Sequence, residues 1–514
     1  FASNIGSEHL IGLAGAGASS GMAMAHWEIQ GWMILILGWV FVPFYTRSMV
    51  YTMPEFLERR YNPQSRTILS VISLVSYVLT KVAVTVYAGG LVFQQVFGIK
   101  ELWGIDFFWI AAIGLVVLTA LYTIFGGMKS VLYTSVLQTP ILLLGSLIIL
   151  VLGFKELGGW DEMMRVCGAV TVNDYGDTMT NLIRSNDDAN FPWLGALIGS
   201  AIIGFWYWCT DQFIVQRVLS GKNEMEARRG TIFGAYLKLL PVFLFLIPGM
   251  IAFALHQKYI GAGGEGFLPM LENGTANADA AFPTLVAKLL PAGVKGLVVC
   301  GILAALMSSL ASLFNSSAML FTIDFYKRFR PQTSEKKLVG IGQVATVVIV
   351  ILGILWIPIM RSVGDVLYTY LQDVQSVLAP GIAAAFLLGI CWKRTSAQGG
   401  MWGLISGMVI GLTRLGAKVY YSNAGEVADS TFKYLFYDMN WLFFCGWMFL
   451  FCIIVVIVVS LATEAPTAEK IQGLVFGTAT KEQKASTRAS WNHWDIIHTV
   501  IILAITGAFY WYFW

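Results

Sequence analysis

The sequence predicts an all-α polytopic membrane protein with about thirteen visible spans, and this prediction comes from its composition and hydropathy. Of the 514 residues, 57% are hydrophobic and only 12% are charged, whereas a soluble domain carries about a quarter charged residues. Apolar runs long enough to cross a bilayer as helices, roughly 20 residues each, recur along the whole chain. These features exclude a soluble enzyme.

The apolar runs are separated by charged or Pro/Gly-rich stretches. They lie at about 2–20, 27–46, 67–96, 105–125, 131–153, 193–215, 230–256, 294–326, 338–360, 364–391, 399–421, 438–463 and 495–514. The first run is incomplete, because the chain opens inside it at Phe1, and we expect further residues upstream. The longest connecting segments are 154–192, 257–293 and 464–494, and all are too short for a soluble domain.

The order of the runs permits an inverted five-plus-five helix repeat. Runs two to five and runs seven to ten make the same number of crossings from opposite faces, and a run rich in Gly, Ser and aromatic residues precedes each group. Such repeats hold substrate and ion between broken helices near the membrane midplane. We therefore divide the chain into a first repeat (1–153), an outer loop (154–192), a second repeat (193–391) and additional C-terminal transmembrane helices (392–514).

The positively charged residues predict how the chain lies in the membrane. Most Lys and Arg residues of the connecting segments occur in one set of alternate loops, which includes the segments 47–66, 217–229 and 327–337. Basic loops are retained on the cytoplasmic side, so this set is expected inside, in the cell membrane. After an odd number of crossings, the C-terminus is then expected outside.

The sequence also excludes several kinds of chemistry and partner. It contains no Gly-x-x-x-x-Gly-Lys-Ser/Thr loop, so we expect no ATP hydrolysis, and its five histidines lie apart, without the spacing of zinc or haem ligands. The 33 basic residues nearly balance the 30 acidic residues, which does not fit a nucleic-acid partner. We therefore expect that the protein is not an enzyme but carries a small molecule across the lipid bilayer. We expect it to work as a monomer or a homodimer.

Polar residues inside the apolar runs form the first candidate site, because they are costly there and mark binding sites or pathways. Lys238 lies deep in its run, where the alternative role is a structural ion pair between helices. Glu28 begins a run near the outer face, where exposure at the interface is the alternative to a binding role. Gln372 adds an amide. Together they supply what a polyhydroxylated ligand requires, because each hydroxyl both donates and accepts a hydrogen bond.

A row of small residues forms the second candidate site. Helical spacing places Ala305, Ser308, Ser309, Ser312 and Ser316 on one face. Their hydroxyls suit Na⁺, together with carbonyl oxygens that an unwound helix at residues 1–15 would release at membrane depth. The alternative is a close-packing face whose hydroxyls bond back to the carbonyl four residues earlier.

Several motifs occur in a fixed order along the first 400 residues or so. They are Phe1-Ala-Ser-Asn-Ile-Gly-Ser-Glu-His-Leu-Ile-Gly-Leu-Ala-Gly15, Tyr51-Thr-Met-Pro-Glu-Phe56, Ala120-Leu-Tyr-Thr-Ile-Phe-Gly-Gly127, Trp206-Tyr-Trp-Cys-Thr-Asp-Gln212 with Gln216-Arg217, and Leu306-Met-Ser-Ser309 through Asn315-Ser316. In this order they resemble the sodium/glucose cotransporters of the solute:sodium symporter family, and the Trp206-Tyr-Trp208 stretch resembles its sugar branch.

The resemblance implies the leucine-transporter-type fold, sodium as the coupling ion, and a role for each matching residue. It implies a sodium site made by the carbonyls of Ala2, Ile5 and Ala305 and the hydroxyls of Ser308 and Ser309. It implies that the sugar is hydrogen-bonded by Asn4, His9, Glu28, Lys238 and Gln372 and stacks on Tyr207, with Trp208 beside it. The outer side would be closed by Leu13, Trp27 and Tyr368.

The sequence therefore predicts a sodium-driven symporter that imports a hexose of the glucose/galactose type by alternating access. The alternatives are a sodium-coupled carrier for inositol, another polyol or a small carboxylate, and a sugar sensor or passive channel that does not concentrate its ligand. Gly204 and Gly31 stand where some relatives carry a polar sugar-contacting residue, which allows a ligand with a different hydroxyl pattern.

Two further departures from the family pattern bear on the number of sodium ions. Ser135 replaces an acid that many sugar carriers have, and Ala311 lacks the hydroxyl expected of members that move two ions. We therefore predict one Na⁺ per substrate. Asp211 either supplies the missing charge from a neighbouring span or simply pairs with Arg217.

Overall fold

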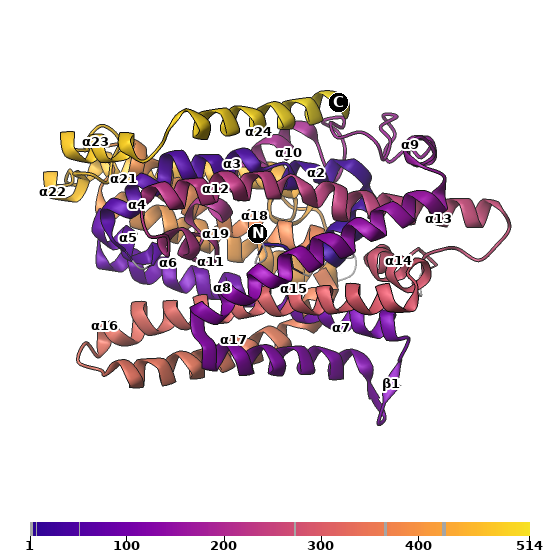
Figure 1. The fold of residues 1–514 in the computed structure, drawn as a ribbon. Helices are drawn as coiled ribbons and strands as arrows, with labels where there is room; N and C mark the ends of the chain where they lie inside the picture. The colour runs from indigo at the N-terminus through magenta and orange to yellow at the C-terminus, as the bar shows by residue number, and fades with distance from the viewer. Residues whose placement is uncertain (1–3, 7, 51, 272–273, 364–366, 424–427) are drawn as a thin grey trace.

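The computed structural model describes residues 4–6, 8–50, 52–271, 274–363, 367–423 and 428–514. In this part of the chain the fold is a bundle of helices that run mostly along one common direction (Figure 1). The one sheet among the described residues is a hairpin of β1 (Glu101–Leu102) and β2 (Ile105–Asp106), which projects from one end of the bundle.

The helical elements follow one another along the chain, and the label η marks π-helical or, for η2 and η7, 3₁₀ segments. Up to residue 157 they are η1 (Glu8–Leu13), α1 (Ala14–Ser20), η2 (Gly21–Met24), α2 (Ala25–Glu28), α3 (Gly31–Ile36), η3 (Leu37–Phe41), α4 (Val42–Ser48), α5 (Met53–Arg60), α6 (Pro63–Ser76), η4 (Tyr77–Val82), α7 (Ala83–Phe97) and α8 (Phe107–Leu157). From residue 160 to 329 they are α9 (Trp160–Gly168), α10 (Trp193–Gly204), η5 (Phe205–Thr210), α11 (Gln212–Leu219), α12 (Glu224–Lys238), η6 (Val242–Leu246), α13 (Ile247–Gly261), η7 (Ala278–Ala280), α14 (Ala281–Leu289), α15 (Ala292–Met319), η8 (Leu320–Tyr326) and α16 (Lys327–Phe329). The remaining elements are α17 (Glu335–Val363), α18 (Leu367–Cys391), α19 (Ala397–Asn423), α20 (Thr431–Lys433), η9 (Tyr434–Asp438), α21 (Trp441–Ala462), α22 (Ala468–Ile471), α23 (Lys481–Ala489) and α24 (His493–Tyr512).

Each predicted apolar run overlaps helical structure, which confirms the polytopic all-α class. Ten helical segments among the described residues are long and apolar enough to cross a membrane. The predicted runs 105–125 and 131–153 both belong to α8, which turns back on itself and so crosses the bundle twice (Figure 1). The run 399–421 is α19, which is less apolar because it carries Arg414 and Lys418.

The long helices are irregular where they pass the centre of the molecule. The amide groups of His9 and Leu10 both donate to the carbonyl oxygen of Gly6, at 3.1 and 3.2 Å, and η1 starts from this turn. The segment η5 ends at Thr210, and the carboxylate of the next residue, Asp211, accepts from the amide of Phe213 at 3.3 Å and caps α11. The break at Gly6 lies in the opening stretch, where the sequence predicts an unwound helix, whereas the break at Thr210 lies inside the run 193–215, which the sequence predicts as one span.

Loops that were predicted to share a membrane face contact each other. On the predicted inner face, Arg66 pairs with Asp324 at 2.6 Å. On the predicted outer face, the amide of Leu182 donates to the carbonyl oxygen of Phe513 at 3.0 Å, and Trp160 donates to the hydroxyl of Tyr512 at 3.2 Å. The C-terminal end of α24 therefore lies on the same face as the 154–192 loop, and the assignment of that face to the outside stays a prediction.

Candidate functional site

A small, largely buried cavity lies between the broken helices. Its volume is about 40 Å³, which holds a few water molecules and is smaller than a sugar ring. The lining residues are Asn4, Glu8, His9, Trp27, Gln30, Lys81, Val84, Ile203, Gly204, Tyr207, Trp208, Lys238, Tyr368, Leu371, Gln372 and Gln375. Six of the seven predicted substrate-binding residues are in this set, and the seventh, Glu28, bonds directly to two of its members.

Glu28 is the centre of the polar contacts behind this wall. Its Oε2 accepts from Nζ of Lys238 at 2.6 Å, and its Oε1 accepts from the hydroxyl of Tyr368 at 2.5 Å. Nε2 of His9 lies 3.3 Å from Oε2. The side chain of Glu28 is 0% exposed, so the expectation that interfacial exposure might explain this residue is wrong, and Lys238 does form the ion pair between helices that was its alternative role.

Other polar atoms of the cavity wall have no hydrogen-bond partner among the described residues. They are Nδ2 of Asn4, Nδ1 of His9, Nε1 of Trp27 and Oε1 of Gln372. All four side chains are buried. An unsatisfied buried polar group costs free energy, and four such atoms around one cavity therefore indicate a ligand with several hydroxyl groups or ordered water.

Aromatic rings cover two sides of the cavity. Nζ of Lys238 lies 5.4 Å from the ring centroid of Trp208, and Nζ of Lys81 lies 4.7 Å from that of Tyr207. Cations over aromatic faces are attracted by the ring quadrupole, so each ring is held by a neighbouring lysine. Tyr207 and Trp208 follow one another on η5 and pack edge to face, with ring centroids 5.1 Å apart.

Lys81, Glu8 and Gln30 line the cavity, but they are not among the residues predicted from the sequence. Lys81 pairs with Oδ2 of Asp211 at 2.6 Å, and the hydroxyl of Tyr77 donates to Oδ1 of Asp211 at 2.8 Å. Lys81 is charged and lies in the middle of the apolar run 67–96, so the rule that selected Lys238 would also have found it.

The predicted sodium ligands that the structure describes do not line this cavity, but Ser309 lies near Glu8, which does. Ala305, Ser308 and Ser309 are buried on α15, and Ile5 is buried in the turn before η1, whereas Ala2 lies outside the described residues. A methyl group on Gly6 would lie 2.5 Å from both Oγ of Ser309 and Oε2 of Glu8. The turn at Gly6 therefore passes directly beside Ser309, and a carboxylate lies close to both.

Ser312 and Ser316, which follow on the same face of α15, have the close-packing role that was the alternative to sodium binding. Oγ of Ser312 donates to the carbonyl oxygen of Ser308 at 2.8 Å, and Oγ of Ser316 donates to that of Ser312 at 2.8 Å. These bonds to the carbonyl four residues earlier satisfy both hydroxyls.

Aromatic packing closes the cavity towards the predicted outer face. The indole of Trp27 stacks on Trp441, with ring centroids 5.4 Å apart at 24°, and meets Phe191 edge to face at 6.1 Å. Tyr368 lines the cavity and bonds to Glu28, and its role in closing the outer side stays a prediction. Leu13, the third predicted outer residue, is fully buried at the end of η1 but does not line the cavity.

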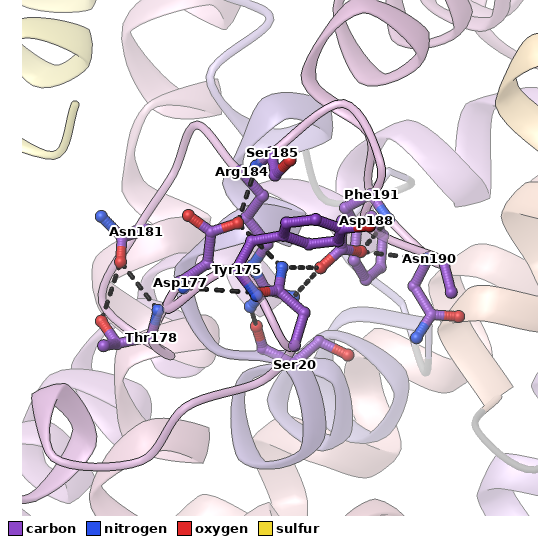
Figure 2. Close-up of polar contacts among 12 residues, drawn as sticks. Ser20, Tyr175, Asp177, Thr178, Asn181, Arg184, Ser185, Asp188, Asn190 and Phe191 are labelled. Carbon is purple, nitrogen blue, oxygen red and sulfur yellow. Dashed lines mark hydrogen bonds and ion pairs between the residues drawn. The ribbon is translucent and has the colours of Figure 1, made fainter.

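Residues 170–191 form a folded strap next to the α1–α2 region, and Figure 2 shows the polar contacts within the strap and to Ser20. The amide of Met22 donates to the carbonyl oxygen of Met179 at 2.8 Å. Arg184 donates to the carbonyl oxygen of Ser20, lies 3.9 Å from Asp188 and lies 5.6 Å from the ring centroid of Phe191. The strap therefore fastens the α1–α2 region and positions Phe191 against Trp27.

A larger cavity, of about 270 Å³, lies on the opposite side. It shares Asn4, Trp208 and Lys238 with the central cavity, and it reaches Arg217 and Glu226 near the α11–α12 connection, a predicted inner loop. These three side chains belong to the walls of both cavities. A buried polar site with a larger space next to it fits the class of small-molecule carriers.

The comparisons with known proteins agree with this class. The profile described as the sodium:solute symporter family matches residues 1–407. The human sodium/myo-inositol cotransporter 2 is 37% identical over 491 residues, covering 93% of this chain and 72% of that protein. The sodium/glucose cotransporter 1 of Ovis aries is 38% identical over 493 residues, covering 90% and 72%. The chain belongs to the sodium:solute symporter family, and it is a sodium-coupled, multi-pass membrane symporter.

The solved structures show the fold. A Na⁺-coupled sialic acid symporter in a substrate-bound, outward-open state has a TM-score of 0.68 to this chain at 20% identity, covering 91% of this chain and 89% of that one. This likeness confirms the predicted leucine-transporter-type fold. The exact boundaries of the two repeats stay a prediction.

Proposed function

We propose that the protein imports a polyhydroxylated six-membered ring, a hexose of the glucose/galactose type, with Na⁺ across the cell membrane by alternating access. One observation carries this proposal: Asn4, His9, Trp27 and Gln372 present buried polar atoms that lack partners among the described residues, all into one cavity. Ring hydroxyls both donate and accept, so they match such a wall. The apolar C–H faces of a sugar ring match the aromatic side chains on η5.

In this proposal each site residue has one task. The substrate is hydrogen-bonded by Asn4, His9, Glu28, Lys238 and Gln372, and it stacks on Tyr207 beside Trp208. The sodium ion is held by the carbonyls of Ala2, Ile5 and Ala305 and the hydroxyls of Ser308 and Ser309. Leu13, Trp27 and Tyr368 close the outer side, and the C-terminus is outside.

The charged residues of the site support a neutral polyol, and not a carboxylate, as the substrate. A carboxylate substrate would need Lys238 as its counter-ion, but Lys238 already pairs with Glu28 at 2.6 Å. Breaking a buried pair and leaving Glu28 uncompensated is strongly unfavourable. A neutral polyol avoids this, because its hydroxyls can bond to the ammonium and the carboxylate together.

A cyclic polyol such as myo-inositol is the second candidate substrate. The human relative that is 37% identical is named a sodium/myo-inositol cotransporter, and the relative from Ovis aries is named a sodium/glucose cotransporter. Both ligands are six-membered rings with several hydroxyl groups, so the same cavity chemistry serves either of them.

Uptake into proteoliposomes tests the proposal. We expect D-glucose, D-galactose or myo-inositol to accumulate above its outside concentration under an inward Na⁺ gradient, and accumulation to stop when K⁺ or choline replaces Na⁺. A short-chain monocarboxylate should not accumulate. A sensor would bind without uptake, and a passive channel would equilibrate the ligand without concentrating it, so either result contradicts the proposal.

A matched pair of glutamine variants links this uptake to the cavity. Gln372→Ala should weaken substrate affinity by about tenfold or more, because buried partners are left unpaired. Gln94→Ala removes the same side chain from the C-terminal part of α7, where the Gln94 amide donates to Asp106 of β2, and should leave affinity unchanged. Equal affinities in both variants would place the substrate elsewhere.

A further inference from the structure

Gln30 is a buried polar residue of the cavity wall that has no role in the substrate, sodium or outer-closure sites proposed above. It directly precedes α3, is 3% exposed and lines the cavity together with Gly204. Its Nε2 donates to the carbonyl oxygen of Ser200 at 2.8 Å. That carbonyl lies one helical turn before Gly204 on α10, so the amide of Gln30 is held against the α10 side of the cavity.

The side chain of Gln30 fills the space in which a side chain at position 204 would begin. A methyl group on Gly204 would lie 2.9 Å from Cδ and 3.1 Å from Nε2 of Gln30, and closer still to Oε1. Carbon atoms in normal contact are about 3.5–4.0 Å apart. A side chain at position 204 and Gln30 in its present position therefore exclude each other.

We propose that Gln30 is a specificity-determining residue, which reads one substrate hydroxyl on the α10 side of the cavity. This inference rests on the proposed function. Positions 204 and 31 are glycine here, and the family resemblance implies polar sugar contacts at these positions in some relatives. The Gln30 amide supplies a donor and an acceptor at the same wall, because Nε2 has a second hydrogen and Oε1 has lone pairs.

The bond to Ser200 makes this contact selective. Because Nε2 is held at 2.8 Å from a backbone carbonyl, the amide plane is fixed and Oε1 cannot follow a hydroxyl that points elsewhere. A site built to hydrogen-bond a hydroxyl discriminates strongly against an analogue without it, because the site's polar group is then left unpaired. The chemical feature that Gln30 reads is therefore the presence and orientation of one ring hydroxyl.

Gln30→Met tests the contact, because methionine keeps the length of the side chain and removes both amide groups. The probes are D-glucose and myo-inositol, each with its monodeoxy analogues, in the proteoliposome assay. We expect the KM of the transported parent compound to rise about tenfold or more, whereas the KM of one monodeoxy analogue stays the same in wild type and variant. Equal losses for the parent and every analogue would mean that Gln30 only ties α3 to α10, and would overturn the inference.

A swap variant tests the exclusion of the two side chains. Gly204→Asn alone should lose most uptake, because its side chain collides with Gln30. Gln30→Ala with Gly204→Asn should regain uptake with a changed preference among D-glucose, D-galactose and myo-inositol. Wild-type affinity in Gly204→Asn alone, or a double variant that stays as inactive as the single one although both elute as folded protein, would overturn the inference.

The unaltered protein separates this inference from the proposed function. If it accumulates none of the three polyols with Na⁺, the proposed function fails and the inference fails with it. If it accumulates one of them, and the Gln30 variants change all compounds alike, only the role of Gln30 is wrong.

Discussion

Glu28 links substrate binding to the outer closure through individual atoms. One carboxylate holds Lys238 from α12 through Oε2 and Tyr368 from α18 through Oε1, and His9 from η1 lies beside it. A cavity of about 40 Å³ cannot admit a sugar while these side chains stay in place. In the proposed function, substrate hydroxyls therefore replace some of these contacts, and loss of the bond to Tyr368 would release one of the predicted outer residues.

At the same scale, Ser309 gives a prediction for sodium coupling. In Ser309→Ala we expect the Na⁺ concentration for half-maximal uptake to rise by roughly fivefold or more, because losing one oxygen ligand costs about 1–3 kcal/mol. Ser317→Ala is the matched control, since Ser317 is a fully buried serine two turns further along α15. Unchanged sodium dependence in folded Ser309→Ala protein would reject Ser309 as a ligand.

The site residues that could be predicted from the sequence are those whose charge is unusual inside an apolar run. Lys238 and Glu28 are charges inside apolar runs, so sequence alone marks them. It could not show that they pair, because 210 residues separate them and they meet only in the folded chain, where α12 packs against α3 directly after Glu28. The amide of Gln30 gave no such signal, because the role that we propose for it depends on its contact with the glycine at position 204.

At the scale of elements, the lengths of the apolar runs predict the membrane spans, whereas local hydrogen bonds determine where a helix is interrupted. The run 193–215 was predicted as one span, but its helix ends at Thr210 and a capping contact of Asp211 starts α11. The sequence Trp206-Tyr-Trp208 marks the region without giving the residue at which the helix stops. The two runs inside α8 were correctly separated by the polar stretch around Lys129, although the helical conformation continues through the turn.

The contact between α18 and α19 gives an element-scale prediction. A methyl group on Gly407 would lie 2.6 Å from Cα of Gly381, so the two backbones touch and leave no room for a side chain. Gly407→Ala should therefore destabilise the protein by about 1–3 kcal/mol through overpacking, and it should displace α18, which carries Tyr368 and Gln372.

A control on the same helix separates this effect from helix propensity. A methyl group on Gly416, also on α19, would meet nothing within 4 Å. Gly416→Ala should leave stability unchanged or raise it by up to about 1 kcal/mol, because alanine favours a helix over glycine. Thermal unfolding in detergent measures both variants, and an unfolding temperature of Gly407→Ala equal to that of the unaltered protein would rule out the tight contact.

At the scale of the whole molecule, the two ends of the transport path are closed to different degrees. Towards the predicted outer face, Trp27, Phe191, Trp441 and the strap of residues 170–191 lie over the cavity. Towards the predicted inner face, a space of about 270 Å³ begins directly behind Asn4, Trp208 and Lys238. The central cavity shares three wall side chains with the inner space, whereas opening the other end requires the loss of the strap's contacts with Ser20 and Met22 and of the bond between Tyr368 and Glu28.

The balance of buried charges gives the last prediction, which is one Na⁺ for each substrate molecule. A second monovalent cation near the first needs a compensating charge, because like charges a few Å apart repel strongly at low dielectric. Ala311 stands where members that move two ions are expected to carry a hydroxyl, and Ser135 stands in place of an acid. Asp211 could have supplied the charge, but its two oxygens already bond to Lys81 and Tyr77. The reversal potential of the coupled current, measured against the sodium and substrate gradients, gives the ratio directly, and a value of two ions would show that Asp211 gives up Lys81 to bind a second Na⁺.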